Sequence, residues 1–150
     1  MKNIRLFIST PIAGFENQQE YVNFRNKMIE LFSQIEQIDG IDNLYSAISG
    51  VSTMDTYESP AESAIRDLKA LRLATHFILF YPYRVISSAL IELGYAMAEN
   101  KKILIIVSQK KDLPYMAQGF EDVQELKTTV IEKDMDKVCV KDIVSFLNSD

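Results

Sequence analysis

The sequence is poor in the residues that build disulfides, metal centres and catalytic pairs: it has one cysteine, Cys139, one histidine, His76, and no tryptophan. One cysteine cannot close a disulfide within the chain or supply a cysteine-based zinc site. Without a second histidine, neither a metal site nor a Cys–His or Ser–His pair is supported. Only 5 glycines and 4 prolines occur in 150 residues, of which 25% are charged, so collagen-like, low-complexity and disordered classes are excluded.

Long apolar runs and clusters of positive charge are also missing. Arg84 interrupts the most apolar segment, residues 77–93, before it reaches the ~18 apolar residues of a membrane span. The start of the chain lacks the hydrophobic region of a signal peptide, and no G-x-G-x-x-G or P-loop follows a strand-like run. The net charge is −5, with lysine pairs at most. We therefore expect one cytoplasmic domain over residues 1–150 that binds a small molecule without a cofactor or metal, and that binds neither nucleic acid nor a membrane.

Strand-like and helix-like segments alternate along the chain. Short apolar runs predict strands at residues 4–9, 44–48, 76–81, 102–107 and 128–131. Helical spacing and capping residues predict helices at residues 16–38, from Pro60 through Leu71, from residue 87 or 88 to about 100, and after a cap at Asp134. This order favours a single doubly wound α/β domain with a five-stranded parallel sheet in the flavodoxin-like strand order 2-1-3-4-5.

The strand order also predicts where a ligand binds. The sheet reverses direction between its first and third strands, and the crevice beyond their carboxyl ends is the expected site. The loops at residues 10–15 and 81–88 meet there. Glu92 falls near the start of the next helix, one turn after Ser88, so both are expected on one helix face beside the crevice. The position of Glu92 also has a structural explanation, because an acid there complements the helix dipole.

Three other residues are candidates with an alternative explanation each. Asp67 lies late in the preceding helix, where the dipole disfavours an acid; it serves either the site or a surface ion pair with a neighbour such as Arg66. Tyr81 and Arg84 lie on the loop at the expected mouth of the crevice. A ring there can stack on a base and an arginine can bind a phosphate, but a polar loop with packed aromatic residues fits the sequence equally well.

Several stretches share one pattern: Asp67-Leu68 before the third strand, the E-L-G-Y-A stretch at residues 92–96, and the K-I-L of the fourth strand at residues 102–104. The segment L-P-Y-M-A-Q-G at residues 113–119 and the first strand with its proline, L-F-I-S-T-P at residues 6–11, fit the same pattern. Over about residues 4–130 the chain therefore resembles the nucleoside deoxyribosyltransferases.

The resemblance implies a catalytic pair. Glu92 would be the nucleophile that attacks the anomeric carbon of a nucleoside or nucleotide, after which a second base or water takes the sugar, and Asp67 would assist the departing base. With the predicted crevice, it gives as substrate-binding residues Ser9, Thr10, Pro11, Ile12, Tyr81, Arg84, Ser88 and Met116. It also implies a homo-oligomer, with candidate interface aromatics at Tyr45, Tyr57 and Tyr83.

Two positions depart from the family's pattern. Phe7 stands where the family has a tyrosine that hydrogen-bonds the nucleophile, and the loop at residues 85–88 reads Val-Ile-Ser-Ser, with Ile86 and its neighbours in place of an aspartate. We therefore expect a weaker or altered activity.

Two other interpretations remain open. One is a TIR-type NAD glycohydrolase, whose first strand resembles residues 6–9 but whose tryptophan-containing approach to the glutamate is absent. The other is a catalytically silent nucleotide-binding sensor domain.

Overall fold

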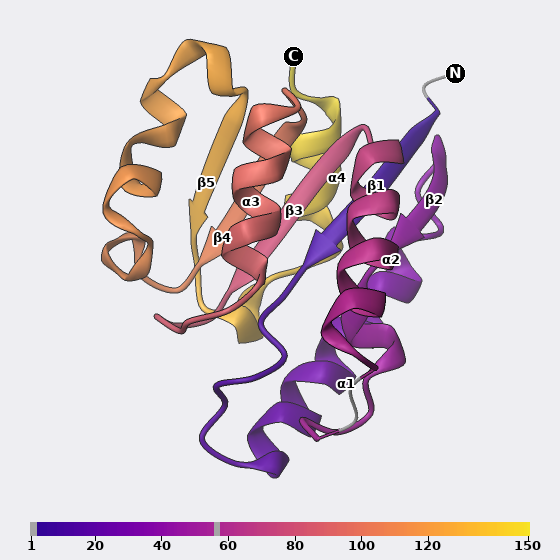
Figure 1. The fold of residues 1–150 in the computed structure, drawn as a ribbon. Coiled ribbons are helices and arrows are strands. Elements are labelled where there is room, and N and C mark those ends of the chain that lie inside the picture. Colours follow the sequence, from indigo (N-terminus) through magenta and orange to yellow (C-terminus); the bar gives the residue numbers. More distant parts are fainter. Residues whose placement is uncertain (1–2, 56–57) are drawn as a thin grey trace.

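A five-stranded parallel sheet forms the centre of the computed structural model, which describes residues 3–55 and 58–150 (Figure 1). The strand order is β2-β1-β3-β4-β5, as predicted. The strands are β1 (Ile4–Ser9), β2 (Ile41–Tyr45), β3 (His76–Tyr81), β4 (Lys102–Val107) and β5 (Thr128–Glu132). The α-helices are α1 (Gln18–Ile35), α2 (Pro60–Leu73), α3 (Ala89–Ala98) and α4 (Val140–Asn148), and short 3₁₀ turns include η1 (Ala47–Gly50) and η3 (Tyr115–Asp122).

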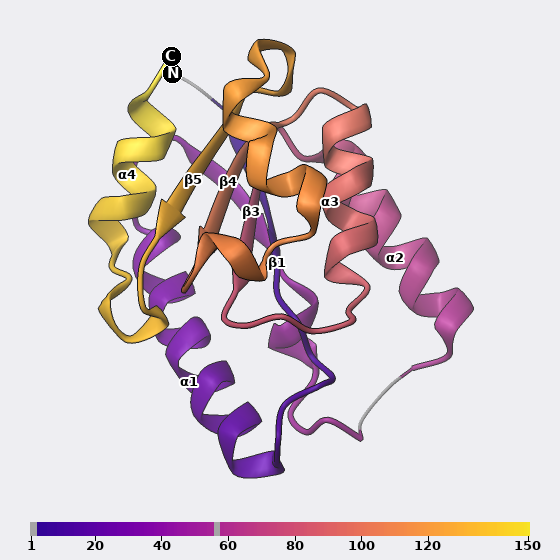
Figure 2. The same cartoon turned by 90° about the vertical axis from the view of Figure 1, so that its left-hand side faces the viewer.

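Helices cover both faces of the sheet. α1 and α4 lie on one face, and α2 and α3 lie on the other (Figure 2). Alternate residues of β1 divide between the two cores, because Leu6 and Ile8 pack with α1 and α4 whereas Phe7 packs with α2 and α3. The central strands β1, β3 and β4 are therefore buried on both sides, which explains their almost continuous apolar sequences.

The edge strand β2 differs from its prediction. It spans Ile41–Tyr45, not residues 44–48, because residues 47–50 form the 3₁₀ turn η1. Asp42 and Asn43 are exposed on this edge of the sheet, so the strand lacks the apolar run by which the central strands are recognised.

The helix ends are set by local side-chain contacts. The predicted capping box of α2 is confirmed: the Ser59 hydroxyl accepts from the Glu62 N–H at 3.2 Å, and the Glu62 carboxylate accepts from the Ser59 N–H at 3.1 Å. The prediction that Asp134 caps the last helix is wrong. α4 begins at Val140, where the Asp142 carboxylate accepts from the Cys139 N–H at 2.9 Å.

The other helices follow their predictions with small differences. α1 is shorter than the helix predicted at residues 16–38. Asn17 caps its start, and Glu36 is the capping residue at its end. Ser88 stands at the start of α3 without a side-chain capping bond, and the Ser87 hydroxyl accepts from the Ala89 N–H instead. None of the helices in the described residues is long and apolar enough to cross a membrane.

Candidate active site

A pocket of about 530 Å³ lies at the carboxyl ends of β1 and β3. These strands are neighbours in register, with Ser9 opposite Leu79, so the loop after β1 and the loop before α3 leave the sheet side by side. Both loops line the pocket, together with the first turn of α3 and the first half of α2. The volume is within the range of pockets that hold small ligands.

Glu92 faces this pocket from the first turn of α3. Its carboxylate accepts a hydrogen bond from the Ser9 hydroxyl, with 2.8 Å between Oγ and Oε1. Ser9 is only 2% exposed, whereas Glu92 is partly exposed, so the bond is partly shielded from water. The interaction that the family resemblance assigns to a tyrosine at the position of Phe7 is therefore made by Ser9, two residues along the same strand.

Burial raises the pKa of Glu92 to about 7; the Ser9 hydrogen bond lowers this pKa, and the negative charge of Asp67 adds to the increase. The dipole at the start of α3 favours the ionised form by roughly 0.3–1 kcal/mol, and loss of hydration outweighs this contribution. A carboxyl group with a pKa near 7 exchanges its proton at physiological pH, which is common among catalytic acids and bases.

Asp67 lines the same pocket from α2, and its side chain is 20% exposed. Asp67 also forms the ion pair with Arg66 that was its alternative explanation, with 3.2 Å between Nη2 and Oδ1. The hydroxyl of Tyr45 on β2 donates to the same carboxylate oxygen at 2.5 Å. Asp67 thus accepts hydrogen bonds from a tyrosine and an arginine and presents negative charge toward Glu92.

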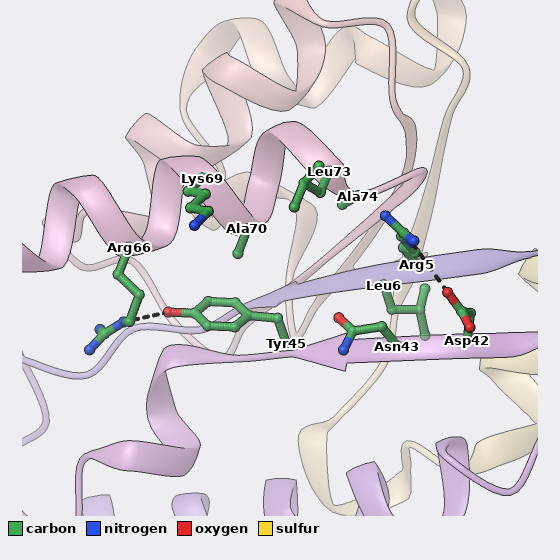
Figure 3. A pocket seen from close by; sticks show the side chains of 10 residues that line it. All are labelled: Arg5, Leu6, Asp42, Asn43, Tyr45, Arg66, Lys69, Ala70, Leu73 and Ala74. Atoms are coloured by element: carbon green, nitrogen blue, oxygen red, sulfur yellow. Dashed lines mark hydrogen bonds and ion pairs between the residues drawn. The ribbon is translucent and has the colours of Figure 1, made fainter.

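Tyr45 is a candidate site residue that was predicted from the sequence only as an interface residue. Its ring contacts Phe7, its partner in the β1–β2 register, and its hydroxyl accepts from Arg66 Nε at 2.6 Å (Figure 3). Burial and the bond to Asp67 raise the pKa of Tyr45 well above its ordinary value, so its hydroxyl remains a donor at physiological pH. Behind this network, a second pocket of about 480 Å³ lies between α2 and β2 (Figure 3).

The loop after β1 contributes three of the predicted binding residues. Ser9, Thr10 and Ile12 line the Glu92 pocket, whereas Pro11 does not. Thr10 is 7% exposed, and within residues 3–55 and 58–150 its hydroxyl has no hydrogen-bond partner. Buried hydroxyls normally have partners, so Thr10 has an unused polar group beside the pocket.

The remaining predicted residues divide between two locations. Ser88 lines the Glu92 pocket, and its carbonyl accepts from the Glu92 N–H at 3.1 Å. Tyr81 and Arg84 line a neighbouring pocket instead. The ring of Tyr81 is buried and its hydroxyl bonds to the backbone of Val85, so it cannot stack on a ligand in the Glu92 pocket. Met116 lies on η3 with 72% of its surface exposed, outside both sets of lining residues.

In the described part of the chain, no three His, Cys, Asp or Glu side chains are grouped in a way that could hold a metal ion. The polar groups that line the pocket include the carboxylates of Glu58, Asp67 and Glu92, the Arg66 guanidinium, and the side chains of Ser9 and Thr10.

The elevated pKa of Glu92 predicts a pH-dependent cost to stability. The folded state holds the proton more tightly than the unfolded chain, so the cost is absent below pH 4.5, grows between pH 4.5 and 7, and is complete above that. Glu92→Gln removes the charge, and we expect it to raise the free energy of unfolding at pH 8 by up to about 3 kcal/mol. The difference should vanish near pH 4.5 in urea denaturation.

Glu99→Gln, at the exposed end of the same helix, is the matched control and should change stability by less than about 0.5 kcal/mol at both pH values. Equal effects of Glu92→Gln at pH 4.5 and pH 8 would contradict the assignment.

Comparison with known proteins gives matches among solved structures. No protein-family model matches the chain, and no curated protein sequence matches it. Among solved structures, the chain is similar to the CMP N-glycosidase BcmB of Clostridium botulinum, with a TM-score of 0.58 and 19% sequence identity. The match covers 93% of this chain and 98% of that one. The likeness therefore extends over the whole α/β arrangement and shows that the two chains share a fold.

Proposed function

We propose that the protein cleaves or transfers across the N-glycosidic bond of a nucleoside or nucleotide, with Glu92 as the nucleophile. The observation that carries the proposal is the buried Glu92 carboxylate, which Ser9 holds by one oxygen at the β1–β3 crevice. The other oxygen is left for a substrate. Two further observations support it: the sequence resembles the deoxyribosyltransferases, and the fold is shared with an N-glycosidase.

The reaction proceeds in two displacements at the anomeric carbon. An oxygen of ionised Glu92 attacks C1′ while the C–N bond breaks, and the bonding electrons leave with the base, which takes a proton from water. The sugar is then held as an ester of Glu92. Water, or the nitrogen of a second base, attacks C1′ and releases the carboxylate, which returns the enzyme to its starting state.

Asp67 contributes electrostatically in this scheme. Its carboxylate accepts hydrogen bonds from Tyr45 and Arg66 and adds negative charge to the pocket. Positive charge develops on the sugar as the C–N bond lengthens, and a fixed carboxylate in a poorly hydrated pocket stabilises that charge. The apolar side chains of Ile12, Ile86 and Ile91 line the same pocket and provide surfaces for the base or sugar.

Substitution of the nucleophile tests the proposal. Ribonucleosides, 2′-deoxynucleosides, their 5′-monophosphates and NAD are each incubated with the protein, and free base or nicotinamide is measured by chromatography. Glu92→Gln keeps the Ser9 hydrogen bond but removes the nucleophile, so turnover should fall at least about 100-fold. Glu99→Gln should retain wild-type turnover.

Release of nicotinamide from NAD alone would favour the TIR-type interpretation. Binding of nucleosides without release of any base would favour a sensor domain. Wild-type turnover by Glu92→Gln would show that the proposed mechanism is wrong.

The pKa of Glu92 predicts the pH dependence of the reaction. Only the ionised carboxylate attacks C1′, so kcat/KM should rise with pH through about 7, and fall about tenfold per unit below pH 6. Ser9→Ala removes the hydrogen bond that lowers this pKa, and the rising limb should move to higher pH. A flat profile between pH 5.5 and 8.5 in the wild-type protein would contradict the assignment of Glu92.

A homo-oligomer is the final part of the proposal, and the interface residues differ from those first considered. Tyr45 and Tyr83 bond within the chain, to Asp67 and to the Gly14 carbonyl, and Tyr57 lies outside the described residues. Large apolar side chains are instead exposed at Ile65 of α2 (71%), Ile86 before α3 (99%) and Ile91 of α3 (71%). Exposed apolar surface of this kind is common at protein interfaces.

Light scattering at micromolar concentration should therefore give at least twice the mass of one chain. Ile65→Asp should lower that mass, because a charge at an apolar interface is desolvated without a partner. Val123→Asp, at an exposed residue between η3 and the next turn, is the control and should leave the mass unchanged. A monomeric wild-type protein would contradict the proposal.

A further inference from the structure

Negative charges outnumber positive charges among the side chains that line the Glu92 pocket. Within the residues that the structure describes, three carboxylates line it, those of Glu58, Asp67 and Glu92, against one cation, Arg66. Glu58 comes from the segment just before α2, whereas Asp67 and Arg66 are neighbours on that helix.

All three nitrogens of the Arg66 guanidinium contact other side chains of the protein. Nη1 forms an ion pair with Glu58, Nη2 pairs with Asp67 at 3.2 Å, and Nε donates to the Tyr45 hydroxyl at 2.6 Å. Glu58 is itself held in place, since its carboxylate also accepts from the Ser63 hydroxyl at 3.3 Å. The charge of Arg66 is therefore matched by carboxylates on two sides.

A phosphate group is expected to bind weakly in this pocket. It carries a charge of about −1.5 to −2 at pH 7 and is bound in proteins by charge-assisted donors, arginine above all. The guanidinium that could serve it is occupied by Glu58 and Asp67, and Glu92 adds negative charge on the opposite wall. An uncharged sugar hydroxyl meets no such repulsion and can donate to the carboxylates that line the pocket.

We propose that Glu58 is a specificity-determining residue: by pairing with Arg66 it makes the pocket accept nucleosides and reject their 5′-phosphates. This inference rests on the proposed function and makes it narrower. A preference for substrates without a phosphate would distinguish this chain from the CMP N-glycosidase that shares its fold, because CMP carries a phosphate.

Removal of the Glu58 charge is the direct test. The wild-type protein should cleave cytidine, adenosine or their 2′-deoxy forms with a kcat/KM at least tenfold above that for the matching 5′-monophosphate. Glu58→Gln frees Nη1 of Arg66, so the ratio of monophosphate to nucleoside kcat/KM should rise at least tenfold. Glu125→Gln removes an equal charge outside the pocket and should leave the ratio unchanged. In the double variant Glu58→Gln/Arg66→Gln the gain should disappear, because the freed cation is gone.

Calorimetric binding of cytidine and CMP to Glu92→Gln protein, with and without Glu58→Gln, gives the same comparison without turnover. The added substitution should raise the affinity for CMP relative to cytidine at least tenfold. A wild-type preference for monophosphates, or an unchanged ratio in Glu58→Gln by both measurements, overturns the role of Glu58 and leaves the proposed function intact. Absence of base release from every substrate overturns the proposed function, and the binding comparison still decides the role of Glu58.

Discussion

The hydrogen bond from Ser9 to Glu92 connects the carboxyl end of β1 to the first turn of α3, and the candidate site is arranged around it. It exists because the strand order places β1 beside β3, so that the chain leaving β1 and the helix following β3 start at one edge of the sheet. The bond is partly buried, and a buried carboxylate or hydroxyl without a partner is costly. The order of the strands thus places the Glu92 carboxylate at the pocket, where the hydrogen bond from Ser9 holds it.

The fold could be predicted from sequence to the extent that burial leaves a pattern. β3 and β4 are covered by helices on both faces, so His76–Tyr81 and Lys102–Val107 read as unbroken apolar runs, and their bounds match the prediction. β2 is an edge strand with exposed polar residues, and its bounds were predicted several residues too late. The last helix was misplaced because Asp134 precedes only the short 3₁₀ turn Met135–Lys137, and α4 begins later, at Val140.

The location of the pocket was predictable, because the strand order and its switch point follow from the alternation of strand-like and helix-like segments, and the structure places Glu92 and Asp67 there. Arg66 was expected as the partner of Asp67, but Ser9 and Tyr45 were not expected as hydrogen-bond partners. Ser9 lies 83 residues from Glu92 and Tyr45 lies 22 from Asp67, and such pairings depend on strand register and on which face each side chain occupies. The ring of Tyr81 was predicted to be accessible to a ligand because the residue lies at the loop end of β3. The ring is instead part of the core.

Two of the carboxylates that line the pocket, Glu92 and Asp67, are held in opposite ways. Glu92 has a single hydroxyl partner and loses much of its hydration, so its pKa rises to about 7. Asp67 sits beside Arg66 and Tyr45, which supply the donors that water would otherwise provide. Its fixed negative charge in turn raises the pKa of Glu92. The ion pair on α2 therefore bears on the proton affinity of Glu92 through Asp67, while loss of hydration is the larger cause of the raised pKa.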